Sequence, residues 1–183
     1  AELGRPLGEV FESFEASRLA SASIAQVHAA RLRTGESVVV KVQRGSVERL
    51  VAKDIRAMAW IAPFLVGRIP VAALANPPAL VELFAETISE ELDFRLEAEN
   101  MLDVARVLRD AGSSVVIVPR PHPELVTRRV LVMERLEGFG YEEAPEMRAA
   151  GIDTAAVLRS LLISFLEGDV ALCRAPRVVH HRD

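Results

Sequence analysis

The stretch that decides the fold is ASASIAQV at residues 20–27, followed at residues 38–42 by the run VVVKV, which contains Lys41. Residues 24–32 and 37–43 are predicted to be strands. The segment RTGE between them has a glycine near its centre, which is typical of a hairpin turn. Side chains alternate between the two faces of a strand, so Lys41 shares a face with Val39 and Gln43, opposite Val38 and Val40. The sequence therefore predicts an antiparallel hairpin that presents a lysine on one face.

This hairpin resembles the nucleotide-binding half of a protein kinase. In that fold a loop G-x-G-x-x-G-x-V covers the ATP phosphates, and a lysine on a following strand reaches the α- and β-phosphates. Val27 and Lys41 match the pattern, but Ala20, Ala22 and Ala25 stand at the three glycine positions. Because alanine adopts positive φ less freely than glycine, the loop backbone is expected to contact a triphosphate less closely.

Several motifs occur in the order typical of the UbiB/AarF family of atypical, protein-kinase-like proteins. They are ASIAQVH at residues 22–28, VVVKVQR at 38–44 and EELDFRLEAEN at 90–100, while VLVMERLEG at 130–138 is similar to the kinase hinge strand. The resemblance covers about residues 19–138 and implies an α+β, kinase-like N-terminal lobe that binds ATP or ADP. It also implies Mg²⁺ in the parent chemistry, and isoprenoid lipids or quinone-pathway proteins as partners.

The resemblance also implies a set of site residues. Lys41 and Glu91 are the expected catalytic residues. The residues expected to contact the nucleotide are Ala20, Ser21, Ala22, Ser23, Ala25, Val27, Val39, Lys41, Met133, Glu134 and Leu136. The alternatives are a solvent-facing Lys41 on an ordinary strand, serines that only cap the local backbone, and a plain core strand at residues 130–138.

The acidic motif E-x-D matches Glu91 and Asp93. Residues two apart on a helix point in different directions, so both acids cannot serve one ligand unless the helix breaks between them. Glu91 is the expected partner of Lys41, and Asp93 is expected to make a separate contact, for example with a preceding segment of a longer chain. The alternative is a weak surface pair of Glu91 with Arg95, and Glu97 is expected to be a surface or packing residue.

Composition limits the possible classes of function. The 183 residues carry a net charge of −4 with no basic stripe, which argues against nucleic acid as a partner. The single cysteine, Cys173, cannot form an internal disulfide or a zinc site, so a reducing compartment such as the cytoplasm is expected, with peripheral membrane association left open. The most apolar window, residues 58–66, is too short to span a membrane.

Hydrophobic periodicity and turn residues predict the remaining elements. Leu7 to Phe14 have the spacing of a short helix, and Ser46 is the expected start of a helix that Pro63 ends. The other expectations are two helices within residues 76–110, strands at 115–118 and 129–136, and a helix at 152–166.

The predicted organisation is a nucleotide-binding lobe at residues 1–138, the start of a helical lobe at 139–170 and an unstructured or aberrant tail at 171–183. The tail ends in HRD at 181–183, a string known from kinase catalytic loops, but it does not match the catalytic loop of UbiB-like proteins and is expected to be a chance match. We therefore expect a truncated atypical kinase or ATPase that binds nucleotide without useful turnover. The alternative is a non-catalytic nucleotide-binding or regulatory module.

Overall fold

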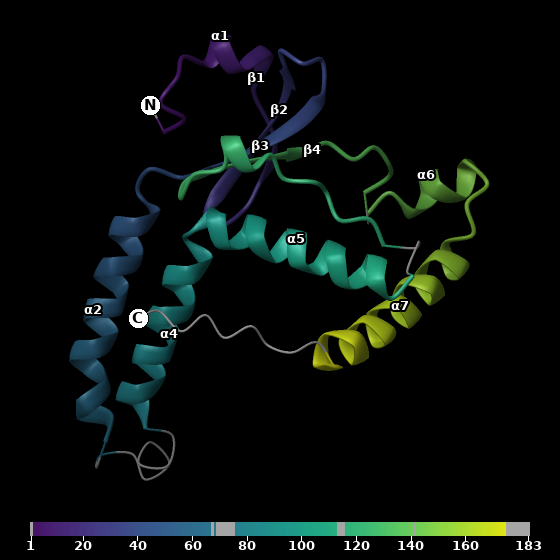
Figure 1. The fold of residues 1–183 in the computed structure, drawn as a ribbon. Helices are drawn as coiled ribbons and strands as arrows, with labels where there is room; N and C mark the ends of the chain where they lie inside the picture. The colour runs from purple at the N-terminus through teal and green to yellow at the C-terminus, as the bar shows by residue number, and fades with distance from the viewer. Residues whose placement is uncertain (1, 67, 69–75, 113–115, 141, 175–183) are drawn as a thin grey trace. The chain divides into compact units, whose positions relative to one another are not determined.

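The computed structural model describes residues 2–66, 68, 76–112, 116–140 and 142–174 (Figure 1). The chain divides into two compact units. One consists of Ala1–Glu99 and Pro121–Arg135, and the other of Asn100–Arg120 and Leu136–Asp183. The first unit contains the β-sheet and most of the predicted site residues.

The sheet has four antiparallel strands in the order β1-β2-β3-β4. Their bounds are Phe11–Ser21 for β1, Ala25–Leu32 for β2, Ser37–Gln43 for β3 and Val130–Glu134 for β4. The predicted hairpin between β2 and β3 is confirmed: Gly35 has φ of 90°, and the Leu32 amide donates to the Glu36 carbonyl at 2.9 Å. Together with the helices, this sheet confirms the α+β class.

The two faces of β3 differ as the alternation predicts. Val38 and Val40 are fully buried in an apolar core, and Val42 packs against it. The other members of this core come from the remaining strands, from α1 (Leu7–Val10) and from the short 3₁₀ helix η1 (Pro123–Leu125), namely Val10, Phe11, Ala30, Leu32, Leu125, Val130 and Val132. This core covers one face of the sheet and leaves the Lys41 face for the start of α5.

Strand β1 is the element that the periodicity did not reveal. The helix expected between Leu7 and Phe14 is only the four-residue α1, and the chain then continues as an eleven-residue strand. Only Phe11 is buried on β1, and its pairing with β2 is interrupted at three places. Because β1 is an edge strand with irregular pairing, its sequence shows no regular alternation of buried and exposed residues.

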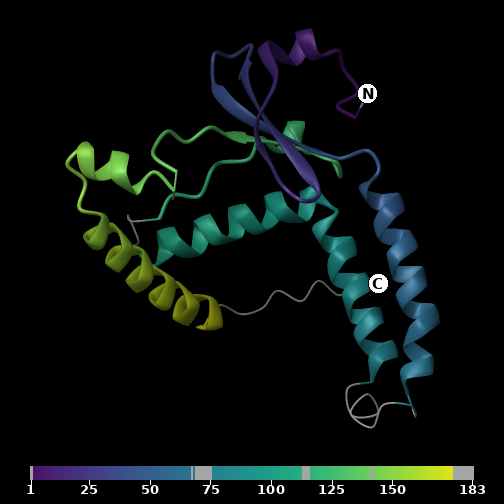
Figure 2. The same ribbon diagram turned by 180° about the vertical axis from the view of Figure 1, so that it is seen from behind.

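Two long helices, α2 (Val47–Leu65) and α4 (Pro77–Glu91), lie side by side, as Figures 1 and 2 show from opposite sides. Pro63 does not end α2 as expected but lies in its last turn, and the helix ends two residues later at Leu65. A second expectation is confirmed: residues 76–110 form two helices, because α4 ends at Glu91 and α5 begins at Phe94 and runs to Asp110. None of the described helices has the length and apolar character needed to cross a bilayer.

The second unit contains α6 (Ala144–Ala149) and α7 (Thr154–Arg174). The helix predicted at 152–166 is confirmed and extends further, so residues 171–174 are helical and not part of an unstructured tail. The strand predicted at 115–118 is wrong for residues 116–118, which are irregular, while Val115 lies outside the described residues. Prolines 119, 121 and 123 remove backbone donors there, and only Pro121 forms an isolated bridge, to Met133. The HRD string at 181–183 also lies outside the described residues.

Candidate functional site

An ion pair between the sheet and the start of α5 is the centre of the candidate site. The Lys41 ammonium donates to both carboxylate oxygens of Glu97, at 2.8 Å to Oε1 and 2.7 Å to Oε2. The side chains are 19% exposed for Lys41 and 37% exposed for Glu97. Both residues belong to the first unit, with Lys41 on β3 and Glu97 in the first turn of α5. The pair is thus partly shielded from water and remains accessible to a ligand.

An aromatic ring packs against the ammonium of Lys41. The Lys41 ammonium lies 4.8 Å from the centre of the Phe94 ring, and Phe94 is fully buried. Lys41 also lies between Val27 on β2 and Leu131 on β4 in the strand register, so its stem runs between apolar neighbours. A cation over an aromatic face gains electrostatic attraction in addition to the ion pair. These contacts limit the positions that the ammonium can adopt.

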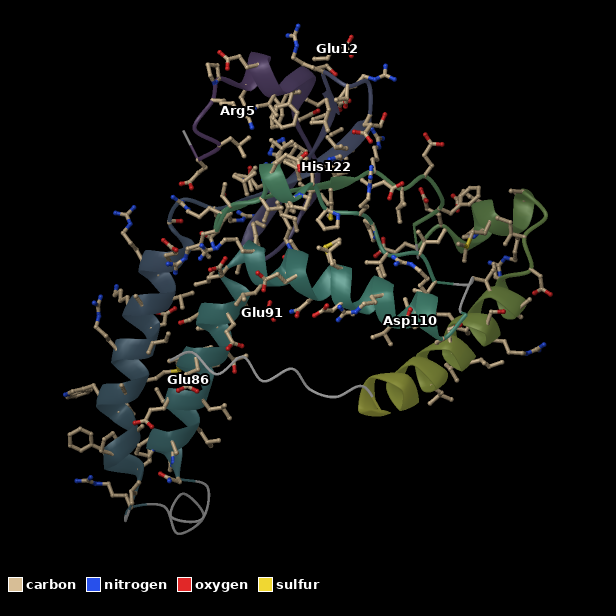
Figure 3. The ribbon with its side chains drawn as sticks, in the orientation of Figure 1. Arg5, Glu12, Glu86, Glu91, Asp110 and His122 are labelled. Atoms are coloured by element: carbon tan, nitrogen blue, oxygen red, sulfur yellow. The ribbon has the colours of Figure 1, made fainter. Side chains whose placement is uncertain are left out.

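The predicted partnership of Lys41 with Glu91 is wrong. Glu91 is the last residue of α4, its side chain is exposed, and Figure 3 shows it at the end of that helix. The helix breaks directly after it, so the face that approaches β3 belongs to α5. On α5, Phe94, Glu97 and Ala98 share one side, because residues three and four apart are neighbours on a helix. That spacing, counted from a helix start at Phe94, is the sequence signal that could have identified Glu97.

Asp93 makes a contact separate from that of Lys41, as expected, and this contact is local. Its Oδ1 accepts a hydrogen bond from the Arg95 backbone amide at 3.1 Å, and its two oxygens accept from the Arg95 guanidinium at 2.9 and 2.6 Å. Asp93 is therefore the N-terminal cap of α5. The hydrogen bond from the Arg95 side chain lowers the pKa of Asp93 below its ordinary value, although partial burial opposes this shift. The alternative pairing of Arg95 with Glu91 is also wrong, since Arg95 pairs with Asp93.

The alanine-rich loop forms a tight connection between β1 and β2. The Ala22 amide donates to the Ala25 carbonyl at 3.0 Å, and the Ala22 carbonyl accepts from the Arg44 guanidinium at 3.2 Å. No residue of this loop has positive φ, and Ala20 pairs with Val27. Both backbone groups of Ala22 are thus used within the protein. Ala25 is fully buried, so its side chain packs inside the protein.

The remaining predicted site residues lie near Lys41 or at the end of β4. Val39 pairs with Ala29 on β2 and with Met133 on β4, which puts Val39 and Met133 on the Lys41 face, both half-buried. Glu134 ends β4 opposite Val38, on the other face. Ser21 and Ser23 are exposed at the loop, with Ser21 accepting a bond from Arg18. Leu136 belongs to the second unit and is exposed.

Comparisons with known proteins agree with this architecture. The family model described as the ABC1 atypical kinase-like domain matches residues 1–171. The Mycobacterium tuberculosis protein Rv0647c is 40% identical over 168 residues, which cover 91% of this chain and 34% of that protein. The probable protein kinase UbiB of Pseudomonas putida is 42% identical over 142 residues, which cover 75% of this chain and 25% of that protein.

A solved structure has the same fold. The complex of Rv3197 with erythromycin, from Mycobacterium tuberculosis, superposes with a TM-score of 0.65 at 31% identity and covers 78% of this chain and 34% of that one. The matched residues therefore make up between a quarter and about a third of the length of these similar proteins.

Proposed function

The chain belongs to the ABC1 atypical kinase-like family, and we propose that it binds an adenine nucleotide, ATP or ADP, on the Lys41 face of its sheet. The observation that carries this proposal is the ion pair of Lys41 with Glu97. A lysine on a central strand, paired with a glutamate on the adjacent helix, is the arrangement with which protein kinases hold the nucleotide phosphates. The resemblance to UbiB-like proteins, predicted from sequence, is confirmed by the matching family.

In the proposed complex each residue has a defined task. Lys41 donates from its ammonium to the α- and β-phosphate oxygens, and Glu97 keeps the ammonium in place. Val27, Val39 and Met133, which share the Lys41 face, contact the base, and the backbone of Glu134 binds its polar edge. Because the Ala22 amide is already bonded to Ala25, the loop contributes less to a triphosphate than a glycine loop does.

Metal-dependent phosphoryl transfer is not part of what we propose for these residues. Within the described parts of the chain, no three His, Cys, Asp or Glu side chains gather closely enough to hold a metal ion. We therefore derive no step through Mg²⁺ and propose nucleotide binding without turnover by this segment. Isoprenoid lipids or quinone-pathway proteins are the partners that the family resemblance suggests.

Nucleotide binding can be tested with a matched pair of lysine variants. The chain has only two lysines, Lys41 in the site and Lys53 on the exposed surface of α2. Hydrogen bonds to charged groups contribute about 1.5–3 kcal/mol, so Lys41→Ala should weaken ADP and ATP binding roughly tenfold to a hundredfold. Calorimetric titration of the wild type, Lys41→Ala and Lys53→Ala measures this. Equal affinities in all three proteins would refute the site.

A further inference from the structure

A buried glutamine connects the strand that carries Lys41 to the chain just before the helix that carries Glu97. Gln43 is only 4% exposed and lies two residues after Lys41 on the same face of β3. Its Nε2 donates to the Leu92 carbonyl at 3.1 Å, and its Oε1 accepts from Arg129 Nε at 3.2 Å. Leu92 offers only an acceptor and Arg129 only a donor, so these partners fix the orientation of the amide.

The Leu92 carbonyl is a group that needs such a partner. Leu92 is the residue after α4, where the helix ends and carbonyls lose their partners within the helix. It is also buried, so water does not replace the missing donor. Gln43 supplies the donor from the sheet and thereby attaches the break between α4 and α5 to β3.

The start of α5 is attached to the sheet at a second point. The Phe94 amide donates to the Arg128 carbonyl at 3.0 Å, and the Gln43 amide donates to the Arg129 carbonyl at 2.9 Å. Glu97 follows Phe94 by three residues, which is close to one helical turn and a rise of about 4.5 Å. Lys41 precedes Gln43 by two residues, or about 7 Å along the strand. With the chain just before the start of α5 attached at Gln43, the first turn of α5 therefore brings Glu97 to Lys41.

We propose that Gln43 is a positioning residue that keeps the Lys41–Glu97 ion pair closed in the absence of any ligand or modification. In regulated kinases the helix with the glutamate moves, and the ion pair forms only in the active state. Here the buried amide of Gln43 ties the start of that helix to the strand of the lysine, so the pair is assembled in the resting protein. The role of Lys41 toward phosphate rests on the proposed function, but the closure of the ion pair does not.

The test uses the two lysines as a probe and an internal standard. The protein is treated briefly with acetic anhydride, and the acetylation rates of Lys41 and Lys53 are compared by peptide mass spectrometry. The variants are Gln43→Met, which keeps the length of the side chain without its hydrogen bonds, and Gln43→Asn, which is one methylene shorter. Gln26→Met is the matched control, because Gln26 lies opposite Val42 on the other face of the sheet. Glu97→Gln gives the reference for an open pair.

In the wild type, Lys41 should react more slowly than Lys53. Gln43→Met should raise the ratio of the Lys41 rate to the Lys53 rate by about tenfold, toward the value of Glu97→Gln, since loss of one buried partner corresponds to roughly that factor. Gln26→Met should leave the ratio unchanged. If Gln43→Met does not retain the wild-type circular dichroism spectrum, Gln43→Asn takes its place and should also raise the ratio of the Lys41 rate to the Lys53 rate.

An unchanged ratio in a folded Gln43 variant would overturn the proposal, and so would an equal rise in Gln26→Met. The labelling needs no nucleotide. A raised ratio in a protein that binds neither ADP nor ATP would therefore refute the proposed function and support the role of Gln43.

Discussion

Replacing Glu97 by glutamine should destabilise the protein, whereas the same change at Glu91 should not. Fully exposed ion pairs contribute about 0.2–1 kcal/mol, and breaking a fully buried pair costs about 3–5 kcal/mol. The side chains of Lys41 and Glu97 are 19% and 37% exposed, which is between these limits and nearer the exposed one for the acid. We therefore expect Glu97→Gln to lower the free energy of unfolding by about 1–2 kcal/mol. Glu91 is exposed at the end of α4, so Glu91→Gln should change it by less than about 0.5 kcal/mol.

Urea unfolding followed by circular dichroism provides the assay, and Lys41→Ala completes two double-mutant cycles. The coupling energy of Lys41 with Glu97 should be about 1 kcal/mol, and that of Lys41 with Glu91 should be close to zero. Because the first pair is partly exposed, its coupling should also fall when salt is added. A coupling of Lys41 with Glu91 as large as that with Glu97 would show that the assignment of the partner from the structure is mistaken.

Three further outcomes are expected. The hydrogen bond from Arg95 lowers the pKa of Asp93, so the stability that Asp93 contributes is complete above about pH 4–5 and is lost as the pH falls through the lowered pKa. Asp93→Asn should therefore reduce the loss of stability toward acid pH, measured by urea unfolding between about pH 5 and 2. The same loss in the variant as in the wild type would exclude this contribution. Replacing Ala20 and Ala22 by glycine should shift the preference from ADP toward ATP in a binding titration, since a more flexible loop allows closer backbone contact with the longer phosphate chain, and unchanged relative affinities would contradict this. The HRD string at 181–183 should not act as a catalytic loop, so Asp183→Asn should leave the rate of ATP hydrolysis with Mg²⁺ unchanged, and a loss of measurable turnover would identify a genuine site.

The strands and helices with regular patterns were predictable because their burial repeats with the period of the element. The alternation of Val38, Val40 and Lys41 gave the correct faces of β3, and Gly35 marked the hairpin turn that the structure contains. The division of residues 76–110 into two helices followed from the length of the apolar pattern and its lack of a coiled-coil repeat. Strand β1 escaped prediction because an irregular edge strand with one buried residue has no such repeat.

The amino-acid sequence by itself determined the family, the α+β class and the face of its strand on which Lys41 lies. Only the tertiary structure decided which acid Lys41 meets. Glu91 and Glu97 belong to one acidic motif, and the choice between them depends on a helix break at Leu92 and Asp93 that local propensity does not fix. The break is held by a hydrogen bond from Gln43, which is 49 residues away in the sequence, and by the Arg128 carbonyl. Such contacts act through space, and no periodicity within the acidic motif contains them.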